Sequence, residues 1–171
     1  MTTSSVPGLA GLNALPADDA QRALLGVCTS PTWARAVTTG RPYHSVARIF
    51  AASDAALAAL TDSEIDAALA GHPRIGERAP ASSDSGGFSD SEQSGLADAT
   101  EALMAALHEG NRKYEDRFGQ VYLVCATGRG GEELLAMLLR RLGNDEATER
   151  RVVREELRKI NRLRLGAMMA Q

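Results

Sequence analysis

The sequence predicts an all-α protein, a single-domain helical bundle of about seven or more helices with one short extended segment near residues 120–126. Alanine and leucine dominate the 171 residues and aromatic residues make up only 4%, a composition that favours helix over sheet. Apolar residues recur at helical spacing, with capping residues before them and glycines after them. The run "QVYLVCA" at 120–126 is the one β-like stretch, and it finds no second strand to pair with.

The first half of the chain predicts four helices. Residues 17–27 follow a proline and carry two aspartates in the first turn, where negative charge suits the helix dipole. In "SPTWARAVTTG", Ser30 is placed as N-cap, Pro31 as first helical residue and Gly40 as terminator. Residues 44–60 form an alanine-rich helix. The next helix opens at a capping box of Thr61 with Glu64 and ends at Gly71.

The second half predicts a low-complexity loop at 81–88, "ASSDSGGF", and then a long helix from Ser89 to about residue 117, with a break near Gly110. Helices at about 131–142 and 145–168 close the chain. No linker divides these elements, so residues 1–171 are expected to form one domain, with residues 1–8 as a candidate disordered start.

Composition and charge argue against nucleic-acid-binding, secreted and membrane-spanning classes of protein. The formal net charge is −3, so there is no basic excess to suggest nucleic acid. The first residues carry neither a basic cluster nor a sustained apolar core, so no secretory signal is expected. No apolar run approaches the roughly 20 residues that span a bilayer. Cys28 and Cys125 form no CxxC motif, and free thiols indicate a reducing compartment. We therefore expect a cytoplasmic protein without membrane or nucleic-acid partners.

The stretch "AGHPRIGERAP" at 70–80 places one of only three histidines on a turn. His72 follows a predicted helix end, Pro73 stiffens the backbone after it, and Gly76 allows a sharp bend. The local pattern favours a helix-terminating surface histidine. The alternative is a general acid or base, since the unperturbed pKa of histidine lies near neutrality.

Arg164 is the most informative charged residue of the last helix. The apolar stripe of that helix is Val153, Leu157, Ile160 and Ala167, and Arg164 lies at its centre, whereas Arg158 and Arg162 point elsewhere. An inward arginine needs an anion, because an unpaired buried charge is costly. Three interpretations remain open. Arg164 pairs with a buried glutamate, extends its charged end to solvent at the helix end, or binds an anionic ligand.

Glu92 also has two interpretations. It closes a second capping box, "SDSE" at 89–92, with Ser89 as N-cap. The capping role explains the residue fully, but a carboxylate at a helix start also lies where it can orient an imidazole or meet a ligand.

Metal and nucleotide sites are not predicted. His44, His72 and His108 show no HxxH or HExxH spacing, and "ATGRGGEELL" has Glu133 where GxGxxG requires glycine. The last helix carries more basic than acidic residues, but the charges are interleaved as on a solvated face. That helix supports one alternative function, a non-catalytic helical interaction module.

Taken together, several motifs resemble one family. These are "LNALPADDA", "VCTSPTWARAV", "RPYHSV", "HPRIGE", "SEQSGL", "EGNRKYEDRFG", "VYLVCATGRGGEELLAMLLRRLGND" and "EELRKINRLRL". The chain resembles 2-oxo-4-hydroxy-4-carboxy-5-ureidoimidazoline (OHCU) decarboxylase, which forms (S)-allantoin in the degradation of urate. The resemblance runs nearly end to end.

This resemblance implies an all-helical fold, a homodimer, no metal or organic cofactor, and a functional link to uricase and a transthyretin-like hydrolase. It places catalytic roles on His72, Glu92 and Arg164. It places substrate contacts on Pro73, Ser89, Asp90, Ser91, Glu92, Gln93, Tyr122, Leu123, Val124, Cys125 and Ala126. The implied reaction needs no cofactor, because the substrate's ring imine can itself accept the electrons released with CO2.

In the expected mechanism, His72 transfers the proton and Glu92 holds its imidazole in one tautomer. Arg164 pairs with an anionic or carbonyl oxygen through its planar fork. Backbone groups of residues 122–126, left without a partner strand, would bind the amide edges of the ring.

Overall fold

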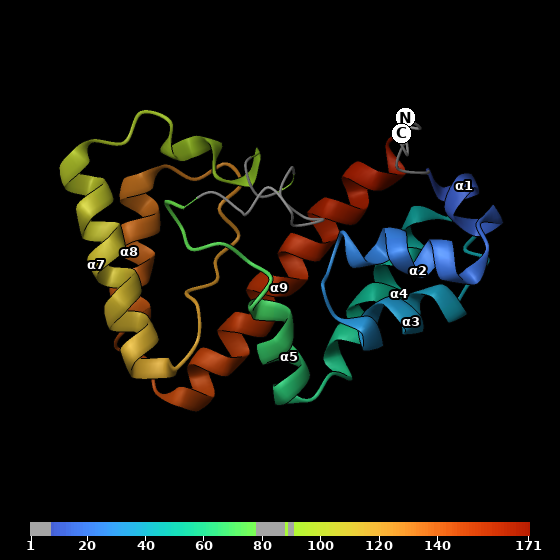
Figure 1. Cartoon of the computed structure of the whole chain (residues 1–171), viewed down its shortest axis with the longest axis horizontal. Coiled ribbons are helices and arrows are strands. Elements are labelled where there is room, and N and C mark those ends of the chain that lie inside the picture. The colour runs from blue at the N-terminus through green and yellow to red at the C-terminus, as the bar shows by residue number, and fades with distance from the viewer. Residues whose placement is uncertain (1–7, 78–87, 89–90) are drawn as a thin grey trace. The chain divides into compact units, whose positions relative to one another are not determined.

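The computed structural model describes residues 8–77, 88 and 91–171, and this part of the chain contains eight α-helices, one short 3-10 helix and no strand (Figure 1). The all-α prediction is therefore confirmed. The helices form two compact units: Met1–Ala67 with Arg158–Gln171 make the first unit, and Ala68–Leu157 make the second unit. The single domain over 1–171 stays a prediction. None of the described helices combines the length and the apolar character needed to cross a membrane.

The first unit packs its helices around a buried tryptophan. It contains α1 (Leu9–Ala14), α2 (Ala17–Leu25), α3 (Pro31–Thr39), α4 (Val46–Ala58), most of α5 (Asp62–Leu69) and the end of α9 (Glu146–Met169). Helix α3 contacts both α2 and α4 (Figure 1). Trp33 is fully buried on α3, and its indole N–H donates to the Ser53 carbonyl of α4 at 3.2 Å. The largest side chain of this core thus also ties two helices together.

The predicted caps of α3 and α5 are confirmed. The Ser30 side chain accepts a hydrogen bond in the first turn of α3, and Pro31 is the first helical residue. At the start of α5, the Glu64 N–H donates to Thr61 Oγ1 at 3.2 Å, and the Thr61 N–H donates to Glu64 Oε2 at 2.8 Å. Each pair satisfies a backbone N–H that a helix start leaves without a partner.

Helix α1 is absent from the sequence-based prediction. It has only six residues and no side-chain N-cap, so its local sequence is a weak helix signal. Two non-local interactions stabilise it. Leu12 is fully buried, and the Arg41 guanidinium donates to the carbonyls of Leu12 at 2.5 Å and Leu15 at 2.8 Å. The cap of this helix end comes from a residue far along the chain.

The second unit is built on α7 (Glu101–Phe118) and α8 (Gly131–Arg141), which pack side by side, with the start of α9 (Figure 1). The segment 121–126 between α7 and α8 is non-helical and forms no strand, as predicted. It contributes three residues to the core of this unit. That core comprises Ile75, Leu107, Tyr114, Tyr122, Val124, Ala126, Leu134 and Leu138.

The helix predicted to run from Ser89 to about residue 117 is interrupted. Ser89 lies outside the described residues, and Ser91 and Glu92 are helical. The chain then leaves the helix, forms the 3-10 helix η1 (Ser94–Leu96), and enters α7 only after Thr100, whose side chain is its N-cap. A Cβ on Gly95 would overlap the carbonyl oxygen of Arg129. Gly95 therefore lets η1 lie against the loop before α8, an approach that the local pattern does not reveal.

The break predicted near Gly110 is also wrong, because α7 is continuous through this residue. A Cβ at Gly110 would lie 2.5 Å from Leu138 Cδ2 on α8. The glycine is thus a point of close approach between two helices, not a helix end.

The inward face of α9 is confirmed over most of its length. The buried positions are Val153, Leu157, Ile160 and Arg164. Ala167 is exposed, so its predicted place in the stripe is wrong, and Leu165 and Met168 are buried instead. Seven residues fall short of two full helical turns by about 20°, so a stripe counted in sevens drifts off the buried face.

Candidate active site

The first predicted site residue lies on the turn that follows α5. The His72 N–H donates to the Leu69 carbonyl at 3.0 Å and closes the helix end. Pro73 then prevents the helix from continuing. His72 and Pro73 are both half-buried, and Ile75, which follows them, is 4% exposed in the core of the second unit. The imidazole therefore sits on a turn whose far end is anchored in the core.

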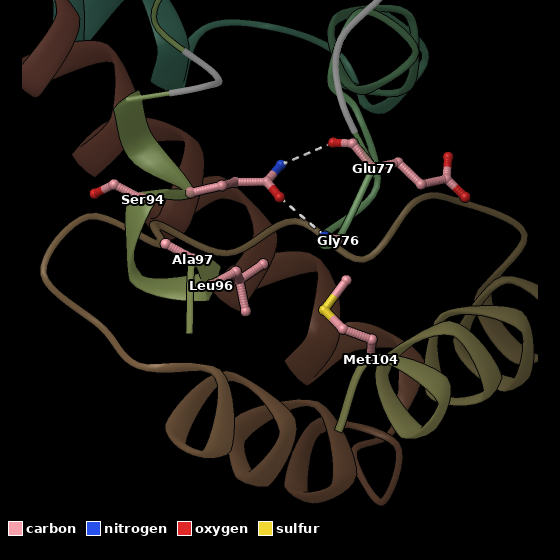
Figure 2. Close-up of a pocket in the computed structure, with 7 residues that line it drawn as sticks. Gly76, Glu77, Ser94, Leu96, Ala97 and Met104 are labelled. Carbon is pink, nitrogen blue, oxygen red and sulfur yellow. Dashed lines mark hydrogen bonds between the residues drawn. The ribbon is translucent and has the colours of Figure 1, made fainter. Parts of the chain in front are cut away.

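Two amide side chains hold the backbone of this turn. Asn111 of α7 donates from Nδ2 to the Ile75 carbonyl at 2.9 Å. The Gly76 N–H donates to Gln93 Oε1 at 2.9 Å, and Figure 2 shows this bond together with a longer one that reaches the Glu77 carbonyl. Both ends of the Ile75–Gly76 peptide link are thus satisfied by side chains from outside the turn.

An ion pair and a glycine complete the turn. Arg74 donates to both carboxylate oxygens of Glu115, at 2.5 Å from Nε and 3.0 Å from Nη2. The hydrogen bond to Glu115, together with its charge, raises the pKa of Arg74. Gly76 has φ of 91°, a left-handed conformation that favours glycine. The turn carrying His72 therefore has a specified backbone path.

A cavity of about 510 Å³ lies beside the turn, large enough for a small organic molecule (Figure 2). Figure 2 shows the Leu96 side chain of η1 and the Met104 side chain of α7 at this cavity. Of the predicted site residues, Gln93 lines it. The complete lining comprises Gly76, Glu77, Gln93, Ser94, Leu96, Ala97 and Met104.

The other predicted contacts near residue 90 precede η1. Ser91 is exposed and Glu92 is half-buried, whereas Ser89 and Asp90 lie outside the described residues. The predicted capping box of Ser89 with Glu92 therefore also falls outside the described part of the chain.

One backbone edge of the 122–126 segment is held by charged side chains. Arg141 Nη1 donates to the Leu123 carbonyl at 2.6 Å. At Cys125, the N–H donates to Glu156 Oε2 at 2.8 Å, and the carbonyl accepts from Arg129 Nε at 3.1 Å. The expectation that this whole run offers free backbone groups is therefore wrong for these three groups.

The opposite edge of the segment is different. Backbone groups of successive residues in an extended chain face opposite edges, so Val124 presents its N–H and C=O away from the charged side chains. Within the described residues, neither group of Val124 has a hydrogen-bond partner, although Val124 is only 3% exposed. The expected substrate contact of this edge stays a prediction.

A buried polar network supports the held edge. The Glu149 carboxylate is 1% exposed and accepts hydrogen bonds from the Tyr114 hydroxyl at 2.5 Å and from Arg141 Nε at 2.8 Å. Burial, followed by the bond to Glu149, raises the pKa of Tyr114 to about 12. Arg141 thereby connects a buried carboxylate to the segment's backbone.

Arg164 belongs to the first unit, where its side chain is 2% exposed and Nη1 donates to the Val27 carbonyl at 3.1 Å. This burial rules out the snorkelling interpretation. Its basic neighbours face another partner, because Arg162 binds the Asp54 carboxylate of α4 at 2.5 Å and Arg158 approaches it at 3.7 Å.

The structure brings some of the predicted residues together. Gln93 binds the turn that carries His72, and Ile75 of that turn shares a hydrophobic core with Tyr122, Val124 and Ala126. Their side chains are therefore part of the core, and the hydroxyl of Tyr122 donates to the Leu134 carbonyl at 3.2 Å.

Sequence reasoning missed the residues that position the turn. Asn111 and Glu115 lie four residues apart, hence on one face of α7, and both reach the turn of residues 74–76. The spacing alone was visible in the sequence, but nothing in it identified the turn as their partner. In the described residues, no group of three or more His, Cys, Asp or Glu side chains is arranged to hold a metal ion.

The comparisons with known proteins agree on one class. A family model described as OHCU decarboxylase matches residues 13–166. The 2-oxo-4-hydroxy-4-carboxy-5-ureidoimidazoline decarboxylase of Amia calva is 32% identical over 139 residues, which is 79% of this chain and 78% of that protein. The uric acid degradation bifunctional protein TTL of Arabidopsis thaliana is 30% identical over 84% of this chain, which spans 45% of that protein.

A solved structure shares the fold. The crystal structure of OHCU decarboxylase in the presence of (S)-allantoin matches with a TM-score of 0.75 at 24% identity, over 86% of this chain and 96% of that chain. By its match to the family model and to the curated relative, the chain is a decarboxylase, a carbon–carbon lyase. It belongs to the OHCU decarboxylase family.

Proposed function

We propose that this protein catalyses the cofactor-independent decarboxylation of OHCU to (S)-allantoin in the degradation of urate. The observation that carries the proposal is the family match over residues 13–166. The names of the relatives support it, because they describe an OHCU decarboxylase and a protein of uric acid degradation.

The reaction follows from the substrate's own bonds. The carboxylate is attached to a carbon next to the ring imine. When the bond to CO2 breaks, its electron pair forms a C=C bond with the imine carbon, and the imine π pair moves to nitrogen, which takes a proton. The enol hydroxyl then loses a proton while the former imine carbon gains one on a single face. One proton is consumed overall, so the enzyme must orient the ring and deliver that proton.

His72 is the proposed proton-transfer residue. Its support is the turn, which is held by Asn111, Gln93 and the pair of Arg74 with Glu115, so that the imidazole is carried by a specified backbone. Glu92 is proposed to hold this imidazole in one tautomer and to favour its protonated form. Pro73 and residues 89–93 are proposed as substrate contacts around it.

Two further groups are proposed to bind the same substrate. The Arg164 guanidinium pairs with an anionic or carbonyl oxygen of the substrate and of the intermediate. The N–H and C=O of Val124 bind an amide edge of the ring, because a buried backbone donor and acceptor without partners are costly.

The test generates the unstable substrate from urate with uricase and a transthyretin-like hydrolase. Addition of this protein is expected to accelerate the appearance of optically active allantoin. The alternative, a helical interaction module that uses its basic last helix, predicts no acceleration but a salt-sensitive binding partner. The ion pairs of Arg158 and Arg162 with Asp54 make that helix less available for such binding.

The pathway also suggests partners. We propose a functional link to uricase and to a transthyretin-like hydrolase, which supply the substrate, and a cytoplasmic homodimer as the working form. The bifunctional relative, whose name refers to uric acid degradation, supports the pathway link.

A further inference from the structure

The ion pair of Arg74 with Glu115 joins two segments of the second unit that are distant in sequence. Arg74 lies on the turn after α5, and Glu115 lies on α7. The guanidinium donates to both carboxylate oxygens, from Nε at 2.5 Å and from Nη2 at 3.0 Å. Two parallel hydrogen bonds between planar groups fix their relative orientation as well as their distance. The pair therefore attaches the turn to a long helix in one defined geometry.

The surroundings of this pair limit its contribution to stability. The side chains of Arg74 and Glu115 are 45% and 26% exposed. Exposed ion pairs stabilise a protein only weakly, because water and salt screen the two charges. Asn111 is different, since it is buried and its loss would leave the carbonyl of the buried Ile75 without this donor. Among the groups that hold the turn, the ion pair can thus be removed at small cost to folding.

Arg74 lies where its position determines that of His72. Only Pro73 separates the two residues, its ring fixes its own φ, and a proline also restricts the backbone of the residue before it. On one side, the His72 N–H is bound to the Leu69 carbonyl at 3.0 Å. On the other side, the Glu77 N–H donates to the Arg74 carbonyl at 3.0 Å, so Arg74 opens a four-residue turn. Because few backbone dihedrals between Arg74 and His72 are free to adjust, a displacement of Arg74 is passed on to the imidazole.

We propose that Arg74 and Glu115 are positioning residues for His72, and that their ion pair contributes to kcat and not to folding. This inference rests on the proposed function and on the proton transfer assigned there to His72. A pair that acts through the imidazole need not touch the substrate, so its loss should change kcat more than KM. A misplacement of a reacting group by about 1 Å can cost up to about 10²-fold in rate.

A double-mutant cycle tests the pair as a unit. Initial rates of allantoin formation over a range of freshly generated substrate give kcat and KM for the wild-type protein, Arg74→Gln, Glu115→Gln and the double variant. Thermal unfolding of each variant is measured alongside. The matched control is Glu109→Gln, because Glu109 lies on the same helix and its ion pair with Lys113, at 2.8 Å, stays within that helix.

Arg74→Gln and Glu115→Gln are each expected to lower kcat by about tenfold and to change KM by less than about twofold. Their Tm should fall by less than about 4 °C, as for the loss of an exposed ion pair. The double variant should lose no more activity than the more affected single variant, because both changes remove the same interaction. Glu109→Gln should keep the kcat of the wild-type protein.

Wild-type kcat in Glu115→Gln would overturn the inference even if Arg74→Gln loses activity, because Arg74 would then act without its partner. Losses that multiply in the double variant, a loss confined to KM, or an equal loss of kcat in Glu109→Gln would also overturn it. Each of these outcomes leaves the proposed function intact, provided that the wild-type protein forms allantoin. No allantoin formation by the wild-type protein would overturn the proposed function and this inference together.

Discussion

At the scale of single residues, many buried polar side chains of the second unit bind backbone groups. Arg141 holds the Leu123 carbonyl, Glu156 holds the Cys125 N–H, and Asn111 holds the Ile75 carbonyl. These bonds remove the cost of unsatisfied groups in irregular segments. They also position the two segments on which most of the proposed site residues lie.

Glu92 is expected to act through the imidazole of His72. Replacing Glu92 with Gln keeps the size and removes the charge that favours the protonated ring, so turnover should fall by roughly 10²-fold. The variant should unfold at the same temperature as the wild-type protein. The measurement is the rate of allantoin formation as a function of pH; an unchanged rate and pH profile would remove this role from Glu92.

Arg164 is expected to need its planar fork as well as its charge. Arg164→Lys keeps a positive charge but cannot bind two oxygens in one plane. Turnover should therefore fall by about 10²-fold or more. Unfolding in urea provides the control, since a variant that is less stable but has normal activity would make Arg164 a structural residue.

At the scale of elements, the outcome of each helix prediction depended on where its stabilising contacts come from. Ser30 of α3 and the Thr61–Glu64 box of α5 act within a few residues of the helix start, so both ends were predictable from the sequence. Helix α1 depends on Arg41, and η1 depends on the contact of Gly95 with Arg129. Such partners are distant in sequence and leave no local pattern.

The same distinction applies to the candidate site. The spacing of apolar residues along α9 predicted that Arg164 is buried. Pro73 and Gly76 predicted the turn at His72. The one-sided use of the 122–126 backbone did not follow, because it requires Arg141 and Glu156 from two other helices. Periodicity predicts which face is buried but not which backbone groups tertiary contacts will occupy.

A substitution at Gly110 tests how closely α7 packs on α8. Alanine is the better helix former by about 1 kcal/mol, but a Cβ here would lie 2.5 Å from Leu138 Cδ2. Overpacking costs about 1–3 kcal/mol, so we expect Gly110→Ala to lower the free energy of unfolding. In a Leu138→Ala background the space is open, and the same change should stabilise. Stabilisation by Gly110→Ala alone would contradict the close approach.

The capping box of α5 predicts a pH dependence. The Thr32 hydroxyl, followed by the backbone and hydroxyl of Thr61, lowers the pKa of Glu64. A lowered folded-state pKa means that the stabilisation is complete above the unfolded pKa of about 4.3 and is lost as the pH falls through the folded value. Glu64→Gln should therefore lower the urea midpoint at pH 7, and this difference should shrink below about pH 4. A difference independent of pH would show that ionised Glu64 is not the cap.

At the scale of the whole molecule, the family match covers residues in both compact units. The proposed site residues are divided in the same way, with His72, Glu92 and the 122–126 segment in the second unit and Arg164 in the first. If substitutions in each unit lower the rate of allantoin formation, both units contribute to one enzymatic activity.

The most direct measurement is the rate at which optically active allantoin appears from freshly generated substrate with the wild-type protein and with folded His72→Asn. The proposed mechanism predicts acceleration by the wild-type protein and a loss of roughly 10²-fold or more in the variant, with unchanged thermal unfolding. Wild-type turnover by folded His72→Asn would contradict the assignment of proton transfer to His72. No acceleration by the wild-type protein would contradict the proposed function itself.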